Sequence, residues 1–296
     1  MQKRTVILSG VLAAVIAAGG YVYIREARAP RLHPLFQELY PVTGDEQAIP
    51  WSCIQDISQT AEMDGGTVTV HQTVTYDNYL GILLEVDFPE EWLTEQEEES
   101  GKAAPAQISL YEIVHGEDGT QEQKRVASRG GSSHQKYPDQ GEGTSALYLG
   151  YDHDRDIFYD GMELCLSIEA LSVSPENVRE FSEPVELCWT VEAPGESVEM
   201  ELDCEAFTGK MILNPFYFNL VLWDAPYTRE ELEDVVQLLD EKGEPVRLPG
   251  SGGGGEGSSG YVSMRRTGGT PMDVEHIRQL KIGDQVFELS AGLPGR

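Results

Sequence analysis

Hydrophobic and polar residues alternate over most of the chain beyond residue 50, with the period of two that is typical of half-buried β-strands. The clearest example is TVTVHQTVTY (67–76), in which valines and a tyrosine share one face and mainly threonines share the other. A second alternating segment, LGILLEVDF (80–88), follows the turn residues Asp77 and Asn78. Together the two segments predict a β-hairpin.

Further alternating segments predict strands at 108–114, 123–127, 146–151, 162–173 and 184–191, separated by Gly- and Ser-rich joints such as RGGSSHQ and DQGEGTS. Strands spaced in this way are typical of a sandwich. APGES (193–197) is the predicted boundary, and a second β unit follows it. Its strands are expected at 198–207, 210–223, 235–240, 245–248, 260–265 and 279–289.

Three segments of the second unit do not follow the strand pattern. Thr228 and Glu231 form a capping box, which predicts a short helical turn running into the strand at 235–240. MDVEHIRQ (272–279) predicts one or two helical turns. SGGGGEGSSG (251–260) joins two predicted strands without a phosphate-binding motif, so we interpret it as a flexible hairpin loop, with a ligand-cradling role as the alternative.

Residues 5–24 form an uncharged run of 20 residues, which as a helix is about 30 Å long and matches the hydrocarbon core of a bilayer. We expect a transmembrane anchor here, with residues 1–4 as a cytoplasmic tail and the remainder extracytoplasmic. A cleaved signal peptide is the alternative, since basic residues precede the run and Ala27-Arg28-Ala29 is a small-x-small site. Four prolines in 25–50 predict a stalk, followed by domains at 51–194 and 195–292.

Acidic residues dominate the composition, with 51 Asp and Glu against 21 Lys and Arg and a formal net charge of −30. Such a chain repels polyanions, which excludes nucleic acid as a natural partner and direct docking onto anionic lipid or teichoic polymer. We interpret the charge as a soluble coat. The collection of divalent cations is the alternative.

Calcium is the one metal for which the sequence offers candidate ligands, namely Asp152, Asp154 and Asp156. With two later acids they fall at the ligand positions of a calcium loop. Ile157 stands where such a loop needs glycine, and the flanking segments have the pattern of strands, so we do not expect an EF-hand; a different oxygen-rich calcium loop is the alternative. A solvated acidic turn is the preferred interpretation. We therefore commit to no metal site and to no cofactor.

The four cysteines fit no metal-binding spacing. In the strands at 162–173 and 184–191, Cys165 and Cys188 each lie on the polar face, where a cross-strand disulfide could join them. Cys204 has the phase of a buried hydrophobic residue. A bond between Cys53 and Cys204 stays open, because four cysteines allow three pairings.

Catalytic motifs are absent from the sequence: its six histidines form no HExxH, and no GxSxG occurs. We therefore predict that the chain is not an enzyme. The four tryptophans are candidates for stacking on sugars, except that Trp189 alternates with apolar neighbours and belongs to a core. They are Trp51, Trp92, Trp189 and Trp223.

The segments 65–86, 210–222 and 271–289 resemble the exported region of an uncharacterised family of single-pass membrane proteins from Gram-positive bacteria. The resemblance implies tandem immunoglobulin-like β-sandwiches and supplies no site residues. Some members carry a cytoplasmic anti-sigma-type module, whereas only four residues precede the predicted helix here. We expect a non-enzymatic, membrane-anchored protein that binds an unknown partner protein in the membrane or envelope, or senses the envelope. The alternative is an enzyme acting on envelope polysaccharide, or its accessory subunit.

Overall fold

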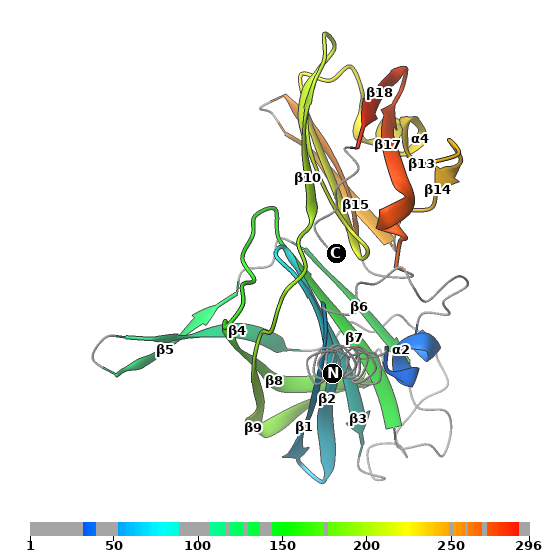
Figure 1. Cartoon of the computed structure of the whole chain (residues 1–296). Coiled ribbons are helices and arrows are strands. Elements are labelled where there is room, and N and C mark those ends of the chain that lie inside the picture. Colours follow the sequence, from blue (N-terminus) through cyan, green and yellow to red (C-terminus); the bar gives the residue numbers. More distant parts are fainter. Residues whose placement is uncertain are drawn as a thin grey trace, which may run out of the picture. The chain divides into compact units, whose positions relative to one another are not determined.

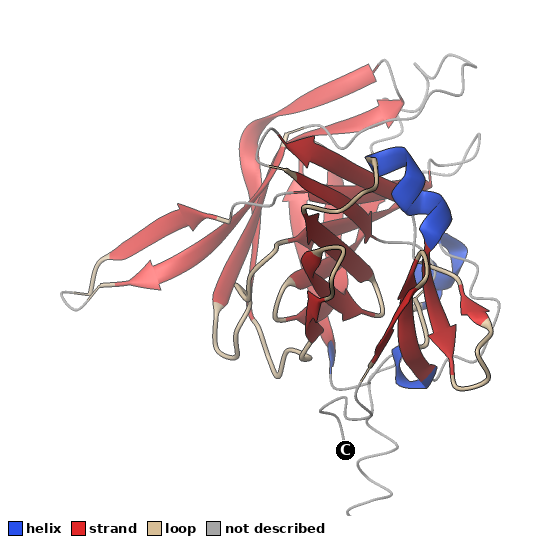
Figure 2. Ribbon diagram, turned by 90° about the horizontal axis from the view of Figure 1, so that it is seen from above, coloured by secondary structure: helices blue, strands red, loops and turns tan. Residues whose placement is uncertain are grey.

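The protein is described by a computed structural model that covers residues 32–39, 53–88, 107–116, 119–126, 130–136, 144–174, 177–248, 251–257, 260–267 and 271–289. Strands dominate these residues and form four antiparallel sheets, with few helices (Figures 1 and 2). The predicted tail, the anchor at 5–24 and most of the predicted stalk lie outside the described residues. Within the described ranges, no helix combines the length and the hydrophobicity of a membrane span.

Two sheets built from residues 53–191, here called the N-terminal β unit, pack on a shared core that runs from Met63 to Val191. This is the arrangement of a β-sandwich. Sheet A has the order β1-β2-β3-β7-β6, and sheet B has the order β5-β4-β8-β9. The strands are β1 (Ile54–Met63), β2 (Gly66–Tyr76), β3 (Tyr79–Asp87), β4 (Ile108–His115), β5 (Gln121–Arg125), β6 (Gly130–Lys136), β7 (Thr144–Asp152), β8 (Glu163–Ser174) and β9 (Asn177–Thr190).

Residues 198–289, here called the C-terminal β unit, also form two sheets that pack on a core of their own, which runs from Leu202 to Leu289. Sheet C has the order β10-β11-β12-β16-β15, and sheet D has the order β14-β13-β17-β18. The elements are β10 (Val198–Asp203), β11 (Thr208–Asn214), β12 (Tyr217–Trp223), α4 (Arg229–Val235), β13 (Val236–Asp240), β14 (Pro245–Val246), β15 (Ser251–Gly257), β16 (Tyr261–Thr267), η3 (Val274–His276), β17 (Ile277–Ile282) and β18 (Gln285–Glu288).

Two local predictions are confirmed. The hairpin formed by β2 and β3 has Tyr76 paired with Tyr79 at its turn. The prediction that its valines and tyrosine share one face is wrong, because a β-bulge between Val70 and Gln72 reverses the alternation. Val68 and Val70 therefore enter the core of the N-terminal β unit, whereas Val74 and Tyr76 pack in another cluster with Tyr79 and Leu83. The capping box of α4 is complete, because the Thr228 hydroxyl accepts from the Glu231 backbone and the Glu231 carboxylate accepts from the Thr228 backbone. Helix α4 then leads directly into β13, as the sequence predicts.

The glycine-rich segments depart from expectation. Residues 251–257 are not a flexible loop but strand β15, which pairs antiparallel with β16 over its full length. Likewise, residues 130–136 are not a joint but strand β6, paired with β7. Glycine has a low intrinsic strand propensity, but hydrogen bonds to a neighbouring, well-formed strand override that preference.

Helix α2 (Pro34–Leu39) lies within the segment that the prolines predict to be a stalk, yet it packs against both β units. Phe36 is 1% exposed, and its ring meets those of Tyr148 and Phe216 edge-on at centroid distances of 5.3 and 5.9 Å. Tyr148 belongs to β7 and Phe216 to the turn between β11 and β12. Residues 32–39 are therefore part of a third core rather than a free spacer.

Candidate functional site

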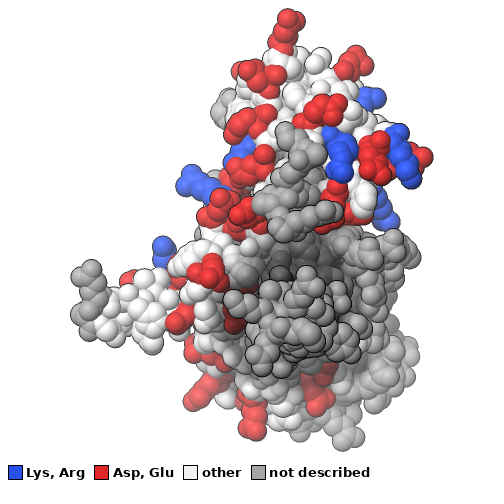
Figure 3. All heavy atoms as spheres, viewed as in Figure 1, with Lys and Arg blue, Asp and Glu red and all other residues white. Residues whose placement is uncertain are grey.

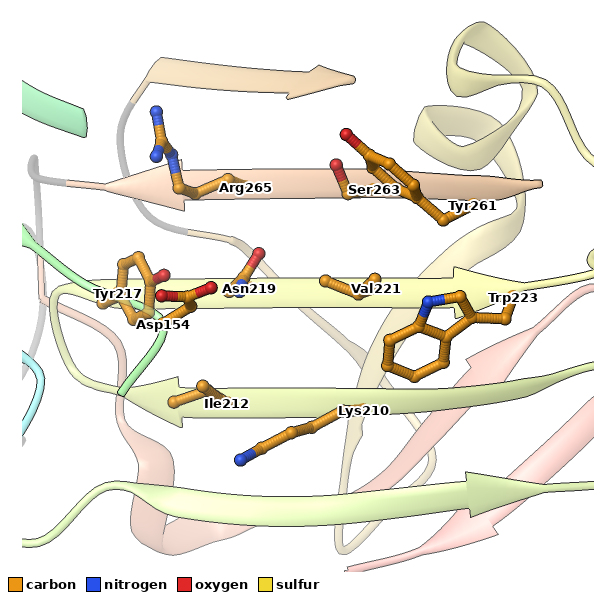
Figure 4. A pocket seen from close by; sticks show the side chains of 10 residues that line it. All are labelled: Asp154, Lys210, Ile212, Tyr217, Asn219, Val221, Trp223, Tyr261, Ser263 and Arg265. Atoms are coloured by element: carbon orange, nitrogen blue, oxygen red, sulfur yellow. The ribbon is translucent and has the colours of Figure 1, made fainter. Parts of the chain in front are cut away.

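A groove lies over three central strands of sheet C, on the face that does not pack against sheet D (Figure 4). Side chains of a strand alternate between the two faces of its sheet. Phe218, Leu220 and Leu222 of β12 therefore enter the core, whereas the residues between them face the groove.

The groove has a volume of about 530 Å³ and is lined by side chains of β11, β12 and β16, together with one residue that follows β7. Strand register brings these side chains together, because Val221 is paired with Lys210 on one side and with Ser263 on the other. The lining residues are Asp154, Lys210, Ile212, Tyr217, Asn219, Val221, Trp223, Tyr261, Ser263 and Arg265.

Aromatic side chains lie at one end of the groove. Trp223 and Tyr261 are register partners on β12 and β16, and Figure 4 shows the Tyr261 ring over β16 and the Trp223 indole extending from β12 in the other direction. Trp223 is 40% exposed, so part of its large apolar surface is in contact with water. A ligand that covered this indole would remove apolar area from water.

The charged side chains of the groove have local partners. Lys210 Nζ lies 2.6 Å from a carboxylate oxygen of Glu199, and both groups are partly exposed. Arg265 Nη1 donates to Asp152 Oδ1 at 3.3 Å, and the Asp152 side chain is fully buried. Burial raises the pKa of Asp152, while the Arg265 guanidinium acts in the opposite direction. Each of the two cations of the groove, Lys210 and Arg265, is therefore paired with a carboxylate.

Glycines border the groove beyond β16. The register places Gly253 opposite Arg265 and Gly255 opposite Ser263. The Ser263 hydroxyl donates to the Gly255 carbonyl at 3.3 Å and accepts from the Gly255 amide at 3.2 Å. Because these glycines have no side chains, they leave this border of the groove open.

The three calcium candidates do not form a ligand set. Asp152 is buried and paired with Arg265, Asp154 lines the groove, and Asp156 is exposed. Among the residues that the structure describes, no group of three or more His, Cys, Asp or Glu side chains is placed to hold a metal ion. The solvated-turn interpretation fits the exposed Asp156 and the partly exposed Asp154, but not the buried Asp152.

None of the cysteines lines the groove. Cys165 and Cys188 are register partners on β8 and β9, and a disulfide joins them with a Cα–Cα distance of 4.0 Å. Cys53 and Cys204 belong to no disulfide, so the pairing that the sequence left open is not made.

Of the tryptophans, Trp189 is 7% exposed in the core of the N-terminal β unit, as its alternation predicts, and Trp223 lines the groove. Trp51 and Trp92 lie outside the described residues. Sequence reasoning missed most of the other groove residues, because they come from strands far apart in the chain. The available signal was alternation, which places Asn219, Val221 and Trp223 on one face.

Comparison with known proteins yields little beyond this geometry. No protein-family model matches the chain, and no curated protein matches it. A crystal structure of a conserved domain protein from Bacillus anthracis is similar, with a TM-score of 0.48 and 16% identity over 85% of this chain and 84% of that chain. A marsupial T cell receptor has a TM-score of 0.15 and 14% identity over 80% of this chain and 100% of that chain.

Proposed function

We propose that this protein is a non-enzymatic binding protein of the cell envelope, held at the membrane by residues 5–24. Its two β units are immunoglobulin-like sandwiches on the extracytoplasmic side, and the groove of sheet C binds an envelope component. The observation that carries this proposal is the groove itself, where an exposed indole adjoins a row of hydrogen-bonding side chains. Most ligand sites combine apolar surface with a few polar groups in this way.

The number of carboxyl groups in the groove favours binding over glycoside hydrolysis. Hydrolysis of a glycosidic bond ordinarily uses two carboxyl groups on opposite sides of the scissile bond. Of the ten described residues that line the groove, Asp154 alone carries a carboxyl group. The accessory role in polysaccharide processing, which needs binding without hydrolysis, is compatible with the same arrangement.

Site-specific photo-crosslinking in the native envelope tests the proposal. A photoreactive residue is placed at Ser263 in the full chain, and the matched control carries it at Tyr159, which is 54% exposed and outside the groove. We expect a discrete crosslinked envelope component from position 263 alone, identified by mass spectrometry. Equal labelling at both positions, or turnover of an envelope polymer by the purified chain, would overturn the proposal.

A further inference from the structure

We infer that the groove of sheet C binds a neutral glycan, with sugar rings stacked on Trp223 and on Tyr261. The inference rests on the proposed function and names the class of ligand. Sugar rings carry one face of C–H groups and a rim of hydroxyls. They therefore match a site in which an aromatic surface adjoins hydrogen-bonding side chains.

The aromatic pair supplies the stacking surface. Trp223 and Tyr261 are directly opposite each other on antiparallel strands, where Cβ atoms are about 5 Å apart. Strand β12 ends at Trp223, because Asp224 adopts a left-handed φ of 56° and its amide donates to the Gly260 carbonyl at 2.9 Å. The indole is thus held at the end of a rigid strand and exposes its surface to the groove (Figure 4).

Hydrogen-bonding groups continue from that surface along the groove. Ser263 and Asn219 follow on the same face, and the guanidinium of Arg265 lies beyond them. The Asn219 amide both donates and accepts hydrogen bonds, as the hydroxyls of a sugar do. The Ser263 hydroxyl donates to the Gly255 carbonyl, so toward a ligand it serves as an acceptor. The volume of about 530 Å³ falls within the range of about 300–1,000 Å³ typical of small-molecule sites.

Charge decides the kind of glycan. On the face shown in Figure 3, acidic side chains cover more of the described surface than basic ones, in keeping with the net charge of −30. The two cations of the groove are neutralised by Glu199 and Asp152. An acidic polysaccharide would meet repulsion from the surroundings without an unpaired cation in the groove to offset it, so a neutral chain is favoured.

The test is titration of the full chain in detergent with two neutral oligosaccharides, the N-acetylglucosamine tetramer and cellotetraose, followed by tryptophan fluorescence and calorimetry. Polygalacturonate is the acidic probe. We expect at least one neutral probe to bind and to change the fluorescence, and polygalacturonate not to bind. Trp223→Ala should weaken the affinity at least tenfold, whereas Trp223→Phe should retain part of it.

Tyr159→Ala is the matched control, because it removes an aromatic ring that is more exposed than Trp223 and lies outside the groove, and it should leave the affinity unchanged. Thermal melts verify that each variant folds. Absence of binding to both neutral probes, preference for polygalacturonate, or equal effects of Trp223→Ala and Tyr159→Ala would overturn the inference. If crosslinking from Ser263 then identifies a peptide or protein, the groove remains a binding site and only the glycan class is wrong; if both experiments fail, the proposed function fails as well.

Discussion

At the scale of single residues, Gly81 shows how a contact distant in sequence constrains a strand. Within the predicted strand 80–88, Gly81 is expected to weaken the strand, because glycine has no side chain to pack. In the structure the phenol of Tyr148 crosses it, and a Cβ at position 81 would overlap the Tyr148 hydroxyl and lie 2.6 Å from its Cζ. Tyr148 has little freedom to move, because its hydroxyl is hydrogen-bonded to that of Tyr79 at 2.9 Å and its ring packs on Phe36.

We therefore expect Gly81→Ala to lower the free energy of unfolding by about 1–3 kcal/mol, through overpacking. Gly255→Ala is the control, because a Cβ there would meet its nearest atoms at 3.8 and 3.9 Å. Its effect should stay within about 0.5 kcal/mol. Urea denaturation measures both variants, and similar losses in the two would show that Tyr148 yields to the added methyl group.

At the scale of elements, helix α2 and the residue before it attach the start of the described chain to the β units. The His33 ring stacks on that of His71 at a centroid distance of 4.2 Å. The His33 backbone amide donates to the Gln72 side chain at 3.0 Å, and Gln72 in turn donates to Asp56. Burial first, and the charge of His71 next, lower the pKa of His33 below its ordinary value of 6.5. Glu85 and Asp56 act in the opposite direction.

This lowered pKa predicts a pH dependence. Because the unfolded chain binds the proton more readily, the stability contributed by neutral His33 is complete above about pH 6.5 and is lost as pH falls through the lower, folded-state pKa. His33→Asn removes the titrating group while keeping a side-chain acceptor before the helix. Urea midpoints at pH 7, 6 and 5 should show the advantage of the wild type over this variant shrinking on acidification. A constant difference would rule out His33 as the source.

At the scale of the whole molecule, hydrogen bonds and an ion pair between polar side chains join the two β units of the described chain. Asn214 donates to Asn78 at 3.0 Å and to Ser197 at 3.2 Å. Arg265 of β16 reaches the buried carboxylate of Asp152 at the end of β7. A buried charge that loses its partner costs far more than an exposed one does.

Arg265→Met should accordingly lower the free energy of unfolding by about 3–5 kcal/mol at neutral pH. The deficit should decrease toward acid pH, because the raised pKa of Asp152 lets the carboxyl become neutral there. Lys210→Met is the control, since the pair with Glu199 is partly exposed and contributes about 1 kcal/mol or less. Equal losses in calorimetric melts would mean that the burial of Asp152 does not decide the cost.

Local patterns were enough for the elements whose causes are local. Alternation predicted the β2–β3 hairpin, and the capping box formed by Thr228 and Glu231 predicted the start of α4. The same reasoning failed at β15 and β6. Their glycines suggest loops, but β15 is a strand because it pairs with β16, and β6 is a strand because it pairs with β7. The groove was not predicted for a related reason. The sequence offers Trp223 as a candidate for stacking on sugars, but it does not show that Tyr261 lies on the neighbouring strand.

The sequence by itself determined the β class, the β2–β3 hairpin, the core position of Trp189 and the acidic composition. These follow from side-chain chemistry and from the alternation of a single strand. Only the tertiary structure decided which strands are neighbours, and hence that Trp223 faces Tyr261, that Asp152 pairs with Arg265, and that Phe36 is buried between Tyr148 and Phe216. Such pairings depend on register and packing between segments far apart in the chain, which no local pattern encodes.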